Sequence, residues 1–418
     1  MTASKLLNTM KLDKIAEKQY KNKQNAVTSV GFIALTIASP VMGLVLLVPA
    51  IPEIVNKFSV SENVGQSLIT LYLIALGLGQ LVYGIASDRF GRRPILLIGS
   101  FIFAVGSGLT LISYSIETLL ACRVIQGLGA AACLSMGRAM INDNFVREEA
   151  AKHMSSAQTI QSTVPIISVL FGGVLVEFFG WKSGMAVSCI AGLIIFFTTL
   201  NRITETHKNR LSKINIIEIT KAYGEILTNL TFLSFAITCG MQSGMFYVLA
   251  GILPYHYEAL GQSALAFGFW FSIMPIGFFI GNFINRRYLV MRGIEIVAFS
   301  GSLITLSSMV ILLIASYTGN LSPISIALPC GLFGFGNGIL ISNATIGAIS
   351  AAGKYAGTGS GFTGAWQMIA GASFGVLIVG IGGAESMLVT VSSVIIISIT
   401  SIICLSYAFV YRYKSNDN

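Results

Sequence analysis

Long apolar stretches separated by short polar connections dominate the chain. A transmembrane helix needs about 20 apolar residues, and twelve stretches approach or exceed that length. They lie at residues 30–51, 65–87, 94–113, 117–141, 153–176, 184–201, 229–252, 264–285, 293–316, 321–343, 355–379 and 386–410. We therefore predict an all-α membrane protein with twelve transmembrane helices.

The polar segments divide the chain into two halves. The longest polar interruption, residues 202–228, falls between the sixth and seventh stretches. It predicts two six-helix halves, 30–201 and 229–410, with a basic tail at 1–29 and a short tail at 411–418. Residues 281–287 weakly repeat the polar turn at 84–94, each after the second stretch of its half. Paired halves of this kind enclose a central substrate site in many transporters.

The composition predicts a lipid-facing exterior. Hydrophobic residues make up 54% of the chain and charged residues only 10%, whereas a soluble domain carries about a quarter charged residues. The net charge of +9 does not indicate a nucleic-acid partner, because the basic residues lie mainly in tails and connections. The six cysteines lie in apolar stretches without paired spacing, which predicts packing roles and no metal site. We expect no cofactor.

The distribution of Lys and Arg predicts the orientation in the membrane. Of the 26 cations, 23 lie in the two tails, the linker and the even-numbered connections, among them Arg138. The odd-numbered connections hold only Lys57 and Lys182, and Arg123 lies inside a stretch. Because Lys and Arg concentrate on the cytoplasmic side, we expect both termini in the cytoplasm. The amino-terminal tail is too long and too charged for a cleaved signal peptide, so we expect it to remain.

Residues 84–94, here called the elbow, form the polar turn between the second and third stretches. They read Gly-Ile-Ala-Ser-Asp-Arg-Phe-Gly-Arg-Arg-Pro and place four charges between two apolar segments. This string resembles G-x-x-x-D-R-x-G-R-R, the signature of the major facilitator superfamily. The resemblance implies the major facilitator fold, with two pseudo-symmetric six-helix halves, and a gating role for the elbow side chains. These are Asp88, Arg89, Gly91, Arg92 and Arg93.

The fourth stretch carries a second candidate motif. Arg123, Gln126, Gly127 and Ala130 share one helix face, and the string resembles the superfamily signature R-x-x-Q-G-x-G. A guanidinium in the apolar zone costs about 2.5–3.5 kcal/mol on insertion scales, so it is a functional candidate. The alternative is that Arg123 pairs with helix ends or with a loop carboxylate, of which Glu53 is the best candidate, and only organises the bundle.

Residues 138–151 narrow the resemblance. They are similar to R-A-x-x-x-D-x-F-x-R-E-E-A-A of the bicyclomycin and chloramphenicol resistance (Bcr/CflA) group, and further matches occur at 342–344 and 356–360. This group implies a transporter of the bacterial inner membrane. The resemblance also implies that Asp88 reaches the amino end of the eleventh helix, whose dipole favours an anion. That contact would latch the two halves on the cytoplasmic side.

Two departures from the group bear on coupling. Val45 stands where relatives often carry an acidic residue, and Ser168-Val169 stands where the antiporter signature has Gly-Pro. No Asp or Glu lies near the middle of any stretch. A proton remains a candidate coupling ion. His153 and His256 are alternative titratable groups, but both lie toward membrane surfaces, where we expect them to be solvated.

Polar residues within the stretches are the candidates for substrate binding, because ligand sites combine apolar walls with a few polar groups. They are Arg123, Gln126, Gln158, Gln161, Gln242, Tyr247, Asn337, Asn343, Trp366 and Gln367. Each is alternatively an inter-helix hydrogen bond. A cation without a nearby carboxylate favours an anionic substrate, and that hypothesis rests on Arg123.

The sequence therefore predicts a monomeric secondary transporter rather than an enzyme, with membrane lipid and a small-molecule substrate as its partners. The leading hypothesis is a drug or metabolite exporter of the Bcr/CflA type. The alternative is a carrier for an anionic metabolite or carboxylate-type siderophore, not necessarily coupled to protons. A membrane sensor built on the same bundle is a third hypothesis, but no appended domain favours it.

Overall fold

The computed structural model describes residues 31–144, 147–206, 216–289, 292–319 and 321–416. Within these ranges the chain is almost entirely helical and contains no β-strand. Twelve of the described helical segments are long and apolar enough to cross a membrane. The predicted all-α membrane protein with twelve spans is thus confirmed, while the predicted basic tail lies outside the described residues.

The amino-terminal half begins with a helix at residues 31–45. Pro49 and Pro52 lie just after a break in this helix, where proline cannot continue the backbone ladder. The first span continues through η1 (Val48–Ala50) and α2 (Ile51–Phe58). The other spans of this half are α3 (Glu62–Phe90), α4 (Arg92–Leu111), α5 (Ile116–Asn144), α6 (Arg147–Phe179) and α7 (Ser183–Arg202).

The carboxyl-terminal half repeats the plan. Its elements are α9 (Leu230–Ala259), α10 (Ala264–Ile284), the π-helical turn η2 (Asn285–Leu289), α11 (Ile294–Tyr317), α12 (Pro323–Ala351), η4 (Gly353–Tyr355), α13 (Ala356–Gly380) and α14 (Met387–Asn416). The predicted linker contains a further helix, α8 (Ile216–Thr228). Lys354 forms an ion pair with Glu225 of α8 at 3.0 Å, and its hydrogen bond lowers the pKa of that carboxyl.

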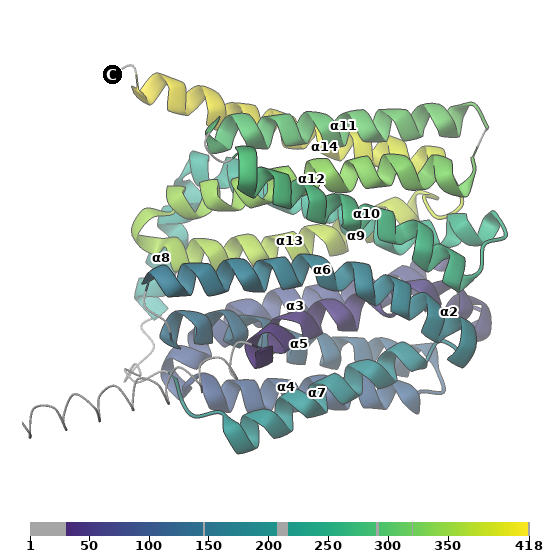
Figure 1. Ribbon diagram of the computed structural model, residues 1–418, viewed down its shortest axis with the longest axis horizontal. Helices are drawn as coiled ribbons and strands as arrows, with labels where there is room; N and C mark the ends of the chain where they lie inside the picture. Colours follow the sequence, from purple (N-terminus) through teal and green to yellow (C-terminus); the bar gives the residue numbers. More distant parts are fainter. Residues whose placement is uncertain (1–30, 145–146, 207–215, 290–291, 320, 417–418) are drawn as a thin grey trace, which may run out of the picture.

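The helices lie side by side with the amino-terminal half below and the carboxyl-terminal half above in Figure 1. The elbow, α8 and the end of α14 lie at one end of the bundle, on the left, which we call the elbow end. The other end is called the distal end. The two halves meet where α3 packs against α13 and α6 packs against α10. These four helices therefore border any path between the halves.

The halves are joined at the distal end. There the amide nitrogen of Asn56 donates to Glu258 Oε1 at 3.1 Å, and the backbone N–H of Leu265 donates to Glu177 Oε2 at 3.3 Å. A Cβ on Gly173 would lie 2.7 Å from the Ala264 carbonyl, so α6 and α10 touch through their backbones.

The same helices separate toward the elbow end. A Cβ on Gly364 of α13 would still lie 3.3 Å from the Gln80 side chain of α3, but one on Gly84 of α3 or Gly357 of α13 would meet no atom within 4 Å. The structure is thus closed at the distal end and open at the elbow end.

Glycines allow close helix packing inside the carboxyl-terminal half. A Cβ on Gly281 of α10 would lie 2.1 Å from the Phe335 carbonyl, and one on Gly338 of α12 would lie 2.2 Å from the Phe278 carbonyl. Such contacts are a main source of helix association in membranes. A buried hydrogen bond at 2.8 Å from Asn343 Nδ2 to Asn285 Oδ1 holds the elbow ends of α10 and α12 together.

We predict that Gly338→Ala lowers the thermal unfolding midpoint of the purified protein by several degrees, because overpacking of this kind costs about 1–3 kcal/mol. Gly361→Ala is the matched control, since Gly361 lies in α13 and a Cβ added there would meet no atom within 4 Å. Equal midpoints for the two variants would contradict the close approach of α10 and α12.

Candidate functional site

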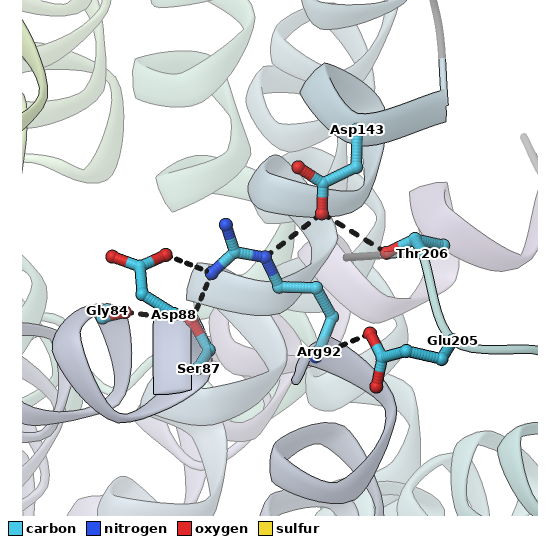
Figure 2. A network of polar contacts seen from close by, with 7 residues as sticks. All are labelled: Gly84, Ser87, Asp88, Arg92, Asp143, Glu205 and Thr206. Atoms are coloured by element: carbon cyan, nitrogen blue, oxygen red, sulfur yellow. Dashed lines mark hydrogen bonds and ion pairs between the residues drawn. The ribbon is translucent and has the colours of Figure 1, made fainter. Parts of the chain in front are cut away.

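The elbow is held by Arg92, whose side chain is only 11% exposed. Its guanidinium lies between two carboxylates, with Nη1 2.7 Å from Asp88 Oδ1 and Nε 3.0 Å from Asp143 Oδ2 (Figure 2). Nη1 also donates to the Ser87 hydroxyl. Asp88 ends α3 and Asp143 ends α5, so one guanidinium fixes two helix ends to the start of α4. The elbow motif and the motif at 138–151 therefore meet in one ion-pair network.

The same network reaches the end of α7. The backbone N–H of Arg92 donates to Glu205 at 2.9 Å, and the Thr206 hydroxyl donates to Asp143 at 3.2 Å (Figure 2). Arg93 donates to the carbonyls of Ile203 and Leu200 at 2.8 and 2.9 Å, which lack intrahelical donors at a helix end. The elbow thus binds α3, α4, α5 and α7 into one unit at this end of the bundle.

Gly91, Arg89 and Asp88 complete the elbow. Gly91 has φ 99°, a backbone conformation that glycine adopts without strain, at the turn between α3 and α4. The Arg89 guanidinium lies 5.3 Å from the Phe90 ring. Asp88 is bound to Arg92 within its own half, and its side chain is 43% exposed. Its predicted contact with the amino end of α13 is not formed in this open arrangement and stays a prediction.

Arg123 lies inside the amino-terminal half and is fully buried. Its guanidinium donates to the carbonyls of Leu68 and Gly43 at 3.0 and 2.9 Å and to the Gln126 side chain. It also lies 4.3 Å above the Tyr72 ring, a cation–π contact. Glu53, the partner expected from the sequence, is not among these contacts. Arg123 therefore joins the first span, α3 and α5 through these bonds, and its role in substrate binding stays a prediction.

Three of the predicted substrate-binding residues also lie within single halves. Gln126 donates to the Ser107 hydroxyl of α4 at 2.8 Å, next to Arg123. Gln242 donates to Ser401 of α14 at 3.2 Å, and Asn337 donates to the Gln242 carbonyl at 3.0 Å. All three are buried. Their observed bonds are the inter-helix hydrogen bonds given above as the alternative.

Another group lies at the junction of the halves. Arg138 of α5 donates from Nη2 to Gln161 Oε1 of α6 at 3.3 Å. The Tyr247 phenol of α9, in the other half, lies within electrostatic range of Arg138. Tyr247 itself donates to the Met368 sulfur of α13 at 3.4 Å. All four side chains are partly exposed, so the junction combines one cation, one amide, one phenol and one thioether on four helices.

Trp366 and Gln367, two more of the predicted substrate-binding residues, directly precede Met368 in α13. Gln367 accepts a hydrogen bond from the Ser243 hydroxyl of α9 at 3.2 Å. Trp366 packs against Gly240 of α9, and its indole nitrogen is buried without a partner among the described residues. The side chain of Gln158 lies outside the described part of the structure. Of the predicted set, Gln161 and Tyr247 thus lie at the junction, and Gln367 bonds α9 beside it.

Arg138 was missed as a site residue, because the count of basic residues placed it with the cytoplasmic connections. The structure places it six residues before the end of α5 at Asn144, inside the helix. The predicted stretch at 117–141 already included this position. A cation inside a stretch is a functional candidate, so the signal that could have identified it was present.

The described titratable groups leave the middle of the spans without a carboxylate. Glu62, Glu177 and Glu258 lie near the distal ends of their helices, and Val45 is packed in the core. His256 is buried, with Nε2 3.0 Å from the Gly383 carbonyl, so the prediction that it is solvated is wrong. The described residues contain no group of His, Cys, Asp and Glu able to hold a metal.

A groove of about 680 Å³ lies elsewhere, along the flank of α6 and α10. Its walls are almost wholly apolar and include Phe171 of α6 and Phe269 and Trp270 of α10. Phe171 and Phe269 are exposed, as expected of side chains that face lipid. The polar groups of the junction do not line it, so the junction is the better candidate site.

Comparison with known proteins agrees with this architecture. The family model of the Major Facilitator Superfamily matches residues 31–376. A bicyclomycin resistance protein homolog of Haemophilus influenzae is 27% identical over 389 residues, which cover 90% of this chain and 96% of that protein. The uncharacterized MFS-type transporter YdgK of Bacillus subtilis is 31% identical over 259 residues, which cover 61% of this chain and 64% of that protein.

A solved structure shares the fold. The crystal structure of a D-xylose–proton symporter matches with a TM-score of 0.68 at 15% identity and covers 90% of this chain and 97% of that chain. At this identity the likeness concerns the fold alone. Together with the family model, which spans most of the sequence, it shows that this chain belongs to the major facilitator superfamily of transporters.

Proposed function

We propose that this protein moves a small organic solute across the bacterial inner membrane by alternating access, as a drug or metabolite exporter of the Bcr/CflA type. The observation that carries the proposal is the one-sided contact between the halves, closed at the distal end and open at the elbow end. The distribution of Lys and Arg supports a cytoplasmic elbow end and cytoplasmic termini. The matched resistance proteins support the substrate class.

The proposed cycle exchanges one set of contacts for another. Opening the distal end breaks the Asn56–Glu258 and Glu177–Leu265 hydrogen bonds. Closing the elbow end brings Asp88 to the amino end of α13, where Gly357 leaves room for close approach. The unpaired N–H groups of that helix end and the helix dipole favour the carboxylate. Each conformation is then stabilised by contacts that the other lacks.

A specific observation favours the second hypothesis, a carrier for an anionic metabolite or carboxylate-type siderophore. Arg138 at the junction has no carboxylate partner among the described residues.

We propose a monomer in either case. A proton remains the candidate coupling ion, although the described spans offer it no central carboxylate. Flux that does not depend on a pH gradient would favour the uncoupled carrier.

The first test is transport by the purified protein in liposomes, with and without a pH gradient. Lipophilic drugs and carboxylate chelates form the two arms of the substrate panel. We expect flux of at least one arm, and preference for the drugs would favour the exporter. Protein that inserts and remains folded but moves no member of either arm would contradict the proposed function.

The second test addresses the latch. We expect Asp88→Asn to lower transport about fivefold to thirtyfold, because a charge at a partly buried helix end is worth about 1–2 kcal/mol. Glu225→Gln is the control, since it removes a carboxylate that pairs with Lys354 at the same end. Thermal unfolding should confirm that both variants fold. Unchanged transport by Asp88→Asn would remove the latch.

The third test separates packing from substrate binding at Arg123. We expect Arg123→Ala to reduce stability, because each buried carbonyl left without a donor costs about 1–3 kcal/mol. The thermal midpoint should fall further than in Arg286→Ala, which removes an exposed cation. Normal stability combined with loss of transport would instead make Arg123 a substrate-binding residue.

A further inference from the structure

The geometry points to Arg138 as an anion-recognition residue that binds a carboxylate of the transported solute at the junction of the halves, assisted by Gln161 and Tyr247. This inference rests on the proposed function and names the substrate class of the same path. It assigns the preference for an anionic substrate to Arg138 instead of Arg123.

Arg138 has no counter-ion among the described residues. Arg92 at the elbow is neutralised by Asp88 and Asp143, and Lys354 by Glu225. Arg138 is partly buried, and its sole hydrogen bond in the described structure goes to the neutral amide of Gln161 at a long 3.3 Å. A partly desolvated guanidinium without an opposite charge binds an anion with little competition.

Arg138 also has the donor geometry that a carboxylate requires. A guanidinium presents five N–H donors in a planar fork that matches a carboxylate, and one described bond leaves most of them available. Gln161 uses its carbonyl oxygen toward Arg138, so its amide N–H groups remain to donate to a second oxyanion oxygen. Arg138 and Gln161 thus form one wall of donors on α5 and α6.

Tyr247, which belongs to the other half of the protein, provides a further donor. The Tyr247 hydroxyl donates to the thioether sulfur of Met368 at 3.4 Å, and sulfur is a weak acceptor. A carboxylate oxygen is a stronger acceptor, so it would redirect this hydrogen bond. An anion held by Arg138 and Tyr247 together would bridge α5 and α9, and its binding would depend on how the halves are arranged.

Arg123 does not offer the same chemistry. It is fully buried within one half, and backbone carbonyls, Gln126 and the Tyr72 ring surround its guanidinium. Its Nη2 has no hydrogen-bond partner among the described residues, but the side chain is 0% exposed, so an anion could reach it only if the packing around it opened. Arg138 is partly exposed, and its hydrogen bond among the described residues is the long one to Gln161.

The test is calorimetric titration of the full-length protein in nanodiscs of zwitterionic lipid. Three carboxylates serve as probes, each with its uncharged amide: benzoate and benzamide, 2-naphthoate and 2-naphthamide, and indole-3-acetate and indole-3-acetamide. We expect at least one carboxylate to bind more tightly than its amide. Arg138→Gln should weaken that carboxylate by about tenfold to a hundredfold and leave the amide unchanged, as expected for a hydrogen-bonded charge.

Further variants separate recognition from folding. Arg138→Lys should keep part of the preference, because the charge remains and the fork is lost. Tyr247→Phe removes one hydroxyl and should weaken the carboxylate several-fold. Arg286→Gln removes an exposed cation at the elbow end and should change nothing. A structural role for Arg138 would instead weaken carboxylate and amide equally, and that result would overturn the inference.

Two other outcomes also count against it. If the unsubstituted protein binds none of the three carboxylates more tightly than its amide, the site is not an anion site. If phosphatidylglycerol added to the nanodiscs weakens the carboxylate in the unsubstituted protein but not in Arg138→Gln, a lipid phosphate is the occupant. Transport of neutral or cationic drugs in liposomes would leave the proposed function intact in both cases.

Discussion

The ion-pair network around Arg92 is the interaction on which the rest of the arrangement depends. Charges near the hydrocarbon must be paired or lie at the lipid head groups, and Arg92 meets Asp88, Asp143 and Glu205 at one point. It therefore fixes the ends of α3, α4, α5 and α7 relative to one another. Deeper in the same half, Arg123 joins the first span, α3 and α5 through backbone carbonyls and the Tyr72 ring. The amino-terminal half is thereby held together as one body.

Each half is internally bonded and packs against the other along α3 and α13 and along α6 and α10, where hydrogen bonds also join the halves. The hydrogen bonds between the halves at the distal end include Asn56–Glu258 and Glu177–Leu265. Glycine-lined contacts such as Gly173 against α10 let the backbones touch without interlocking side chains. A shared apolar core, which includes Leu73 of α3, Val169 of α6 and Phe271 of α10, also joins the halves. An alternating cycle would therefore exchange apolar contacts as well as the hydrogen bonds at the distal end.

The sequence predicted the helices well and the site only in part. Twelve spans followed from composition because lipid leaves few alternatives for an apolar backbone. The elbow was found because its charges interrupt two apolar stretches.

The faces of the helices were not predictable. Gln242 and Asn337 turned inward to their own half, whereas Gln161 and Tyr247 reached the junction. Periodicity places such residues on a face but does not say which neighbour that face meets. His256 was expected in solvent, yet the carbonyl of Gly383 binds it in the interior.

We propose that the two halves open alternately at the elbow and distal ends. Double electron–electron resonance on spin-label pairs that span the halves tests it most directly. One pair replaces Arg202 and Arg286 at the elbow end, and the other replaces Tyr114 and Tyr317 at the distal end, all of which are exposed. The account predicts two distance populations for each pair, with the elbow distance shortening under conditions in which the distal distance lengthens. Single, unchanging distances at both ends under transport conditions would contradict it.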